Sequence, residues 1–418
     1  MAYIGSTPTT QSFISGTDYF NGDGTTVAFT MSRSVASVND IQAVVNNVVQ
    51  VPNDAYTISG TTITFTSAPS AGTSNVYVRY LSTTTQSITP SQGTVGWSQL
   101  NSDTQQDLGI SFKNRIINGA MAIDQRNAGA TQAITSAGTP TYCLDRWAVS
   151  LGNTASGTLT TQRVAGDAIN QYAVRIARTA GTYADNIRFY QVIETSNCYD
   201  LQGKNITISW RAMQGSSYTG GAQVLTIITG SGTDQGIASM VSGTWTSSAF
   251  NFPTVTGTLS TSFSTFTATF AVPAGTTEIG LRISTGNFSG TGSANDYLDI
   301  TGVQLEVGTQ ATTFDYRSIG TELALCQRYY EFNGQSYNCV WNGNTTSGST
   351  YYKGVTFIVT KRATPTIATI TNLSQVGFPA TASTATDLSI GGFQLSRTSN
   401  STVNSGYFID TWVASAEL

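Results

Sequence analysis

Histidine is absent from the 418 residues of the chain, and charged residues make up only 10% of it. Without histidine, the chain cannot use Ser-His-Asp or Cys-His catalysis, a histidine-ligated zinc site or a histidine pH switch. It has only four lysines and a formal net charge of -4, so the basic face of a nucleic-acid-binding protein is missing. We therefore expect partners that are neutral or weakly charged.

Long apolar runs are also missing. No stretch approaches the roughly 18 apolar residues of a membrane-spanning helix. The start of the chain has neither the basic nor the apolar part of a secretion signal, so we expect neither secretion nor membrane insertion. The four cysteines, Cys143, Cys198, Cys326 and Cys339, lie far apart, which favours buried free thiols over disulfides and folding in a reducing cytoplasm.

Glycine is abundant, with 41 residues, as are threonine, valine, isoleucine and aromatic residues. This composition is typical of short strands and tight turns. We expect an all-β chain of serial β-sandwich or jelly-roll domains joined by short helices. Residues 1–82 are predicted to form a first β-sandwich, in which Val27, Phe29 and Met31 alternate in one strand and Asn46-Asn47 makes a tight hairpin turn.

Residues 83–112 are predicted to be a linker, because the part up to residue 96 is rich in turn residues and has no periodicity. A short helix is expected over residues 98–108, with Trp97, Leu100 and Leu108 near one face. A single apolar stripe needs a partner to bury it, and the same helix in sister chains would supply one. This is a first indication of an oligomer.

Residues 113–318 read as one large strand-rich domain. Ile206, Ile208 and Trp210 alternate with polar residues, which places Trp210 in the core. Near the end of the region the inward-facing positions change from even to odd numbers across Thr301-Gly302, and a β-bulge at Gly302 would explain the change. About 200 residues of such strands without helices favour a two-sheet jelly roll.

Residues 319–333 are predicted to form a linking helix, and residues 334–418 a third, smaller β-sandwich. Leucine, cysteine and tyrosine recur at spacings of three and four from Thr321 to Phe332, where Thr321 can cap the start and Gly334 can end the helix.

Carboxylates are the remaining catalytic candidates, and glycoside hydrolysis needs two of them roughly 5 to 10 Å apart. Asp296 with Asp299, and Asp124 with Asp145, lie at or near predicted strand ends. The structural interpretation is favoured: Asp296 shapes a turn, Asp299 points outward from its strand, and Asp145 pairs with Arg146 or caps a loop.

A metal site is not expected. The segment Asn21-Gly22-Asp23-Gly24 resembles a calcium-binding loop, but Tyr19 and Thr30 stand where an EF-hand needs acids. A plain hairpin turn is favoured, and we predict neither a metal nor a cofactor.

Glycan recognition needs aromatic faces that stack on sugars, together with polar groups that bond hydroxyls. For any single aromatic residue, a place in the core or in a subunit interface is the favoured alternative. The ligand-binding candidates are Tyr183, Tyr218, Trp245, Tyr337, Trp341, Tyr351 and Tyr352.

Several segments, taken in order, resemble parts of bacteriophage tail fibre proteins. Those of the first domain are Tyr19-Phe20-Asn21-Gly22-Asp23-Gly24-Thr25-Thr26 and Val49-Gln50-Val51-Pro52. Those of the middle domain are Asn114-Arg115-Ile116-Ile117-Asn118-Gly119-Ala120-Met121, Asp145-Arg146-Trp147, Val303-Gln304-Leu305-Glu306-Val307-Gly308 and Thr313-Phe314-Asp315-Tyr316-Arg317. The linking helix, Glu322-Leu323-Ala324-Leu325-Cys326-Gln327-Arg328-Tyr329-Tyr330, and the end, Ala414-Ser415-Ala416-Glu417-Leu418, are similar to the same family. The resemblance covers most of the chain.

The resemblance implies a homotrimeric fibre in the virion, synthesised in the host cytoplasm. The first domain would attach to the phage tail or baseplate, the middle domain would be similar to a carbohydrate-binding module, and the last would be a tip domain facing the host. The implied function is non-enzymatic adsorption to a host polysaccharide or lipopolysaccharide. A purely structural virion component, such as a capsid fibre or baseplate connector, is the alternative, and a glycan depolymerase is a third hypothesis.

Overall fold

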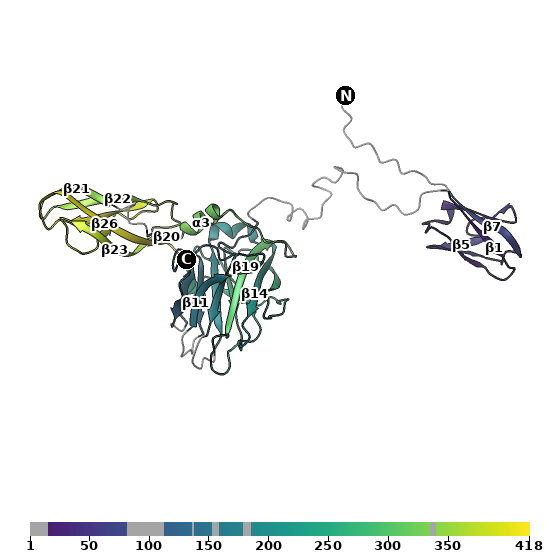
Figure 1. The fold of residues 1–418 in the computed structure, drawn as a ribbon, viewed down its shortest axis with the longest axis horizontal. Coiled ribbons are helices and arrows are strands. Elements are labelled where there is room, and N and C mark those ends of the chain that lie inside the picture. The colour runs from purple at the N-terminus through teal and green to yellow at the C-terminus, as the bar shows by residue number, and fades with distance from the viewer. Residues whose placement is uncertain (1–15, 82–112, 136–137, 153–158, 179–184, 335–339) are drawn as a thin grey trace, which may run out of the picture. The chain divides into compact units, whose positions relative to one another are not determined.

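The computed structural model describes residues 16–81, 113–135, 138–152, 159–178, 185–334 and 340–418 (Figure 1). The chain divides into two compact units, residues 1–101 and 102–418, and each is described by itself. Antiparallel sheets dominate both units, so the prediction of an all-β chain of sandwiches is confirmed. Within the described residues, no helix is long and apolar enough to cross a membrane.

The first unit contains a small sandwich of a four-stranded sheet, β1-β7-β3-β4, and a three-stranded sheet, β2-β6-β5. Its core combines residues from both sheets, including Ile41, Tyr56, Ile63 and Val78. The elements are β1 (Thr17–Gly22), β2 (Ala28–Thr30), η1 (Val38–Asp40), β3 (Ile41–Val45), β4 (Val48–Val49), β5 (Tyr56–Ser59), β6 (Thr62–Phe65) and β7 (Gly72–Tyr80).

Two predicted turns of this sandwich have different outcomes. Asn46 and Asn47 have φ angles of 48° and 63° and join the paired strands β3 and β4, which confirms the tight hairpin. Asp23 accepts hydrogen bonds from the backbone N–H groups of Thr25 and Thr26, as a turn residue does. The hairpin predicted there is wrong, because this turn joins β1 and β2, which belong to different sheets.

The jelly roll of the second unit has two six-stranded sheets. We call the first the β13 sheet, with strand order β16-β15-β18-β13-β10-β9, and the second the β19 sheet, with order β17-β14-β19-β12-β11-β8. Their strands are β8 (Gln132–Ile134), β9 (Thr141–Leu144), β10 (Trp147–Leu151), β11 (Leu159–Ala165), β12 (Tyr172–Ala177), β13 (Ile187–Ile193), β14 (Asn205–Gln214), β15 (Val224–Gly230), β16 (Ala249–Asn251), β17 (Ser264–Ala271), β18 (Glu278–Ser284) and β19 (Tyr297–Val307).

The core of the jelly roll lies between these sheets and explains why the strands alternate. Trp147 stacks on Phe189 with ring centroids 4.4 Å apart, and Trp210 stacks on Phe266 at 5.4 Å. Both tryptophans are fully buried, which confirms the core position predicted for Trp210. A buried aromatic side chain contributes roughly 1.5–3 kcal/mol through burial alone, so these stacks are major sources of stability.

The predicted bulge is present at Gly302. Ser209 of β14 pairs with Gln304 and Arg211 with Thr301, so two residues of β19 lie opposite one residue of β14. Gly302 has a φ of +59°, which a residue without a Cβ adopts at little cost. The bulge keeps Ile300 and Val303 both in the core, as the change of parity requires.

The expectation of no helices between residues 113 and 318 is wrong. A short helix, α2 (Ile237–Val241), and two 3-10 turns, η3 (Thr195–Asn197) and η4 (Tyr199–Leu201), interrupt the strands. With only five residues, α2 is too short to show a helical period in the sequence. Ile237 and Met240 of α2 are buried with Tyr190 and Val192 on the outer side of the β13 sheet.

The linking helix exists but is shorter than predicted. Helix α3 (Ile319–Gln327) is capped by Ser318, whose side chain accepts a hydrogen bond from the N–H of Thr321, so Thr321 is not the cap. The chain leaves the helix at Arg328 and enters β20 (Tyr330–Asn333), well before Gly334. Tyr330 and Phe332, which were predicted to be helical, lie instead in β20, which pairs with the long strand β26.

The last sandwich also has two sheets. In one sheet, β26 pairs with β20, β21 and β23, and the other sheet has the order β22-β25-β24. Phe393, Leu395, Phe408 and Trp412 are among its core residues. Its remaining strands are β21 (Val340–Thr345), β22 (Thr350–Thr356), β23 (Thr366–Val376), β24 (Thr384–Thr386), β25 (Gly392–Thr398) and β26 (Val403–Ser415).

The residues after β26 return to the jelly roll, next to which the C mark lies in Figure 1. Glu417 forms ion pairs with Arg126 and Arg146, and Leu418 is buried against the outer side of the β13 sheet.

Three predicted free cysteines, Cys143, Cys198 and Cys326, are buried and unbridged, as expected. Burial raises the pKa of the Cys143 and Cys198 thiols to about 12, so both are protonated and unreactive at neutral pH. Cys339 and the helix predicted over 98–108 lie outside the described residues.

Candidate functional site

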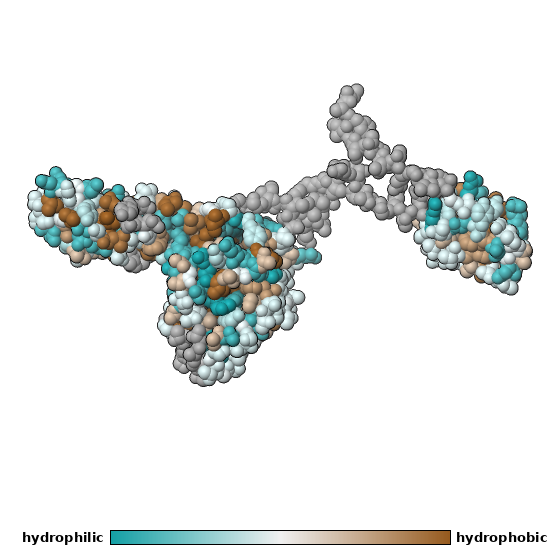
Figure 2. Space-filling model, viewed as in Figure 1, coloured by the Kyte–Doolittle hydropathy of each residue, from teal (hydrophilic) through white to brown (hydrophobic). Residues whose placement is uncertain are grey.

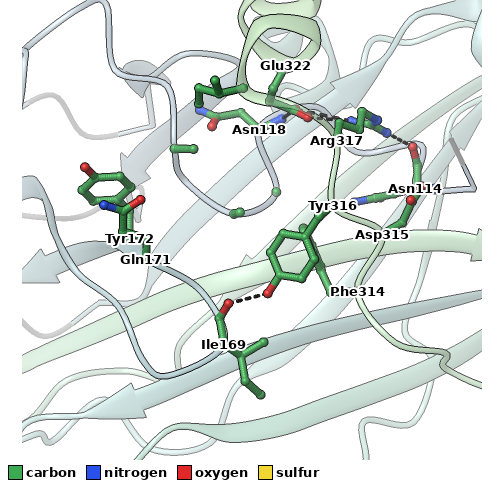
Figure 3. A pocket seen from close by; sticks show the side chains of 14 residues that line it. Asn114, Asn118, Ile169, Gln171, Tyr172, Phe314, Asp315, Tyr316, Arg317 and Glu322 are labelled. Carbon is green, nitrogen blue, oxygen red and sulfur yellow. Dashed lines mark hydrogen bonds and ion pairs between the residues drawn. The ribbon is translucent and has the colours of Figure 1, made fainter. Parts of the chain in front are cut away.

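Two neighbouring hollows at the β19 sheet share Ile169, Phe314 and Tyr316 as walls. One, drawn in Figure 3, has a volume of about 220 Å³, and the other of about 330 Å³. We call the pair the Tyr316 groove.

The segment after β19 is held in place by two buried polar side chains of that strand. Glu306 accepts hydrogen bonds from the N–H and the hydroxyl of Thr312, at 2.9 and 2.6 Å. Gln304 accepts one from the N–H of Asp315 at 2.8 Å and donates to Glu306 at 2.9 Å. These bonds fix the backbone on both sides of Phe314, so the aromatic residues that follow β19 have a defined position.

Tyr316 is 54% exposed and presents its aromatic ring to the groove. Its hydroxyl donates to the backbone carbonyl of Ile169, and Phe314 packs against it edge-on with centroids 4.8 Å apart (Figure 3). Partial burial, together with the negative charge of Asp167, raises the pKa of the Tyr316 phenol. The phenol therefore stays neutral at physiological pH, and the ring is anchored by its tip with much of its surface accessible.

Asn170 supplies an amide beneath the second hollow. Its side chain is fully buried, its Oδ1 lies 3.3 Å from the Tyr316 hydroxyl, and its Nδ2 has no hydrogen-bond partner among the described residues. A Cβ on Gly302 would lie 2.9 Å from that Nδ2, so the glycine of the bulge makes room for the amide. An unpaired buried amide donor costs about 1–3 kcal/mol unless a partner arrives.

Asp167 positions Asn170 and the neighbouring Arg211. Its carboxylate accepts the backbone N–H groups of Ile169 and Asn170 at 2.9 and 2.6 Å, and the Nε of Arg211 at 2.6 Å. Burial opposes the charge, but the hydrogen bonds from Asn170 and Arg211 outweigh it and lower the pKa of Asp167. The carboxylate is therefore ionised, and it orients the guanidinium that lines the second hollow.

The first hollow has a polar wall opposite Tyr316. Arg317 pairs with Glu322 of α3, and Glu322 also accepts the N–H of Asn118 (Figure 3). Arg317 also donates to the carbonyl of Ile116. Gln171 and Tyr172 also line this hollow. Arg163 lies 4.5 Å from the centroid of the Tyr172 ring and covers one of its faces.

This arrangement suits a ligand with both hydroxyl groups and apolar C–H faces. An accessible aromatic ring, amide groups and hydroxyls converge on the groove, and such a combination orients sugars in binding sites. Much of the visible surface in Figure 2 is pale, the colour of residues of intermediate hydropathy, as expected from the low content of charge. Among the described residues, no group of three or more His, Cys, Asp or Glu could hold a metal ion.

The aromatic residues predicted from the sequence lie elsewhere. Trp245 is 3% exposed and packs with α2, where it cannot offer a ring face. Tyr218 lines a separate hollow of about 510 Å³ and packs edge-on against Phe288 at 5.6 Å. Tyr183 lies outside the described residues.

Three of the four predicted candidates in the last sandwich are described. Trp341 stacks on Phe408 with centroids 5.9 Å apart, and Tyr351 packs beside Trp341 while its hydroxyl accepts the N–H of Thr346. Tyr352 is 57% exposed and stays a candidate. Tyr337 lies outside the described residues. The structure therefore distributes the predicted residues over two domains and does not bring them together.

The predicted carboxylate pairs are engaged by other groups. Asp296 accepts from Arg178 at 2.7 Å, and Asp299 binds Arg175 through two bonds of 2.8 Å. Asp124 caps backbone N–H groups of residues 127 and 129. Of the two alternatives predicted for Asp145, the structure shows the loop cap, because its carboxylate accepts from the N–H and side chain of Gln125; Arg146 pairs with Glu417 instead.

Sequence reasoning missed Tyr316 and Asn170 as site residues. One signal was available: Phe314 and Tyr316 alternate in the segment that follows the last strand of the jelly roll, where an aromatic pair is not needed for the sheet. Asn170 gave no signal, because its role depends on Gly302, which is 132 positions away in the sequence but adjacent in space.

No family model matches the chain, and no curated protein matches it in sequence. Among solved structures, it is similar to the enzymatically active domain of tailspike protein 4 of bacteriophage CBA120, with 14% identity over 47% of this chain and a TM-score of 0.26. This chain covers only 22% of that one.

Two further structures are carbohydrate-binding modules. A family 22 xylan-binding domain from Paenibacillus barcinonensis is 15% identical over 39% of this chain and 92% of that domain, with a TM-score of 0.25. A family 11 module from Clostridium thermocellum, solved with a mixed-linked tetrasaccharide, is 10% identical over 44% of this chain and 100% of the module, with a TM-score of 0.23.

Proposed function

We propose that this chain is a bacteriophage tail fibre protein that adsorbs the particle to its host by binding a surface glycan without cleaving it. The observation that carries the proposal is the Tyr316 groove, where an accessible ring, held at its hydroxyl, lies beside the amide of Gln171 and the guanidinium of Arg211. Polar groups of this kind can bond sugar hydroxyls, and the ring can stack on the C–H face of the same sugar.

The order of the fibre-like segments supports a virion protein. In this proposal the first sandwich attaches to the phage tail or baseplate, and the jelly roll and last sandwich face the host polysaccharide or lipopolysaccharide. The chain acts as a homotrimer, so that several weak glycan sites on one particle combine to give strong adhesion.

The absence of cleavage is part of the proposal and is supported by the state of the carboxylates. Asp296 and Asp299 each bind an arginine, Asp124 accepts hydrogen bonds from its own loop, and Asp145 accepts them from Gln125. A general acid and a nucleophile need access to the glycosidic bond, and groups engaged in this way do not offer it.

Binding of the purified full-length chain to intact host cells and to their extracted polysaccharide tests the function. We expect saturable binding, a trimer mass by light scattering and no new reducing ends. Tyr316→Ala should weaken polysaccharide binding by about tenfold, the loss expected for about 1.4 kcal/mol of stacking. Tyr199→Ala is the matched control, because Tyr199 is 71% exposed on the same jelly roll.

A structural virion component is the second candidate, because Ile169 and Ile319 are exposed beside Tyr316 and could pack against another chain. In that case Tyr316→Ala would lower the oligomeric mass, and the wild-type chain would not bind polysaccharide. Released sugar would instead support a depolymerase and contradict the proposal.

A further inference from the structure

The outer face of the β13 sheet carries two arginines on adjacent strands. Arg188 of β13 pairs across the strands with Ser284 of β18, and Tyr190 pairs with Arg282, so the two arginines are diagonal neighbours on one face. Thr226 of β15 lies opposite Arg282 on its other side. We call this surface, formed by Ser150, Arg188, Tyr190, Thr226, Phe250 and Arg282, the arginine face.

Arg282 has no carboxylate partner among the residues that the structure describes. Its Nε and Nη2 donate to one acceptor, the hydroxyl of Thr226, at 3.2 and 2.9 Å. A guanidinium has five N–H groups, so the other donors of Arg282 remain available. Elsewhere in the jelly roll, Arg175, Arg178 and Arg211 each bind an aspartate.

The uncompensated charge is unfavourable for the folded protein. Partial burial lowers the pKa of Arg282, the phenol of Tyr190 raises it by a smaller amount, and the positive charge of Arg188 adds the smallest effect, a further lowering. A half-buried charge without a partner is normally avoided, and its presence indicates a site where the partner comes from outside.

The surroundings of Arg282 define what that partner can be. Ser150 and Tyr190 are buried beneath the arginines and bond each other at 3.1 Å, so the floor is rigid and polar. Phe250 is 38% exposed, and its ring centroid is 5.7 Å from the guanidinium of Arg282. An anionic group next to an apolar ring face matches a sugar that carries a carboxylate, because arginine pairs with planar carboxylates and aromatic rings stack on sugars.

We propose that the arginine face binds the carboxylate of an acidic sugar, with Arg282 as its cationic partner and Phe250 against the sugar ring. The inference rests on the proposed glycan-binding function, but it concerns the face of the jelly roll opposite to the Tyr316 groove. It also names a ligand chemistry, an anionic sugar, that the near-neutral composition of the chain did not suggest.

The test compares oligogalacturonate with its methyl ester, two probes that differ in the charge of the carboxyl group. Isothermal titration of the full-length chain should show binding of the acid and at least tenfold weaker binding of the ester, because the neutral ester cannot accept charge-assisted hydrogen bonds from Arg282. Arg282→Gln should weaken binding of the acid by a similar factor. Arg79→Gln, which removes one exposed positive charge from the first sandwich, should leave it unchanged.

Further arms of the experiment separate the alternatives. Arg282→Lys should recover only part of the affinity, because lysine lacks the planar fork. Equal binding of acid and ester, equal affinities in Arg282→Gln and Arg79→Gln, or a similar affinity for inorganic phosphate would each overturn the proposal. Tyr316→Ala should leave oligogalacturonate binding intact, so the failure of one site is distinguishable from the failure of the other. Urea unfolding of each variant confirms that it is folded.

Discussion

The two outer faces of the jelly roll use arginine in opposite ways. On the β19 sheet, Arg175 lies directly across from Asp299, binds it through two hydrogen bonds and covers the ring of Tyr297 at 3.7 Å. On the β13 sheet, Arg282 lies across from Tyr190 and Thr226 and meets no carboxylate among the described residues. The residue across the strand therefore decides whether an arginine joins strands of the protein or is left to bind something else.

A second arginine of the β19 sheet that is held by a carboxylate lies at the end of β12, where Arg178 and Asp296 are both fully buried. Arg178 also donates to the carbonyls of Ser289 and Gly290, so one guanidinium ties together three segments. Buried pairs of this kind add little net stability over an apolar pair, but breaking one leaves an uncompensated charge.

The largest effect is expected from Arg178→Met. The substitution leaves Asp296 buried without its cation and should lower the free energy of unfolding by about 3–5 kcal/mol, as measured by urea denaturation. Arg282→Met is the matched control, because it makes the same chemical change where no buried carboxylate depends on the arginine. Similar losses in the two variants would remove the distinction between the faces.

A second prediction concerns Asp145, a buried carboxylate that accepts hydrogen bonds from the neutral Gln125. Burial raises its pKa from 3.8 to about 6. Between these values the folded chain holds the proton that the unfolded chain has lost, so its contribution to stability is present at low pH and is lost as the pH rises through 6. The loss amounts to about 3 kcal/mol.

Urea unfolding between pH 4 and pH 7 measures this loss. The difference in unfolding free energy between the wild type and Asp145→Asn should fall with rising pH, since the variant has no carboxyl group to ionise. Asp387→Asn, at an exposed position, should give a flat difference. A flat difference for Asp145→Asn as well would show that this carboxyl titrates normally.

The smallest effect is expected for the stability of Arg282→Gln. The variant loses hydrogen bonds to Thr226 but is freed from repulsion by Arg188, so its free energy of unfolding should stay within about 1 kcal/mol of the wild type or rise. Added salt should reduce any gain in the free energy of unfolding of the variant over the wild type, because salt screens the repulsion between Arg282 and Arg188 in the wild type. A loss above about 2 kcal/mol in urea denaturation would instead assign Arg282 to the structural class of Arg175 and Arg178.

Local patterns predicted much of the fold. The positive φ angles of Asn46 and Asn47, the core position of Trp210 and the bulge at Gly302 could all be read from short stretches, because each follows from side-chain alternation or turn chemistry. The wrong predictions concern helices, whose extent depends on contacts with distant residues or whose length is too short for a pattern. Pairing with β26 ended the linking helix early, and α2 was too short to have a period.

The candidate sites were much less predictable. Tyr218, Trp245, Trp341 and Tyr351 are aromatic residues of the kind that binds sugars, but their neighbours in space occupy most or all of their rings. Tyr316 was not predicted as a ligand-binding residue, because its neighbours along the chain resemble a segment that closes the scaffold of the domain. Its accessibility depends on Glu306 and Gln304, which hold the segment against β19.

The sequence by itself determined the β class of this protein, its serial organisation and the exclusion of histidine chemistry, because strand alternation, turn residues and composition are local or global properties of one chain. Only the tertiary structure decided which arginines have a carboxylate, which tyrosine keeps an open face and which amide lacks a partner. Those properties depend on residues such as Asn170 and Gly302 or Arg282 and Thr226, which are distant in sequence and become neighbours only when the sheets form.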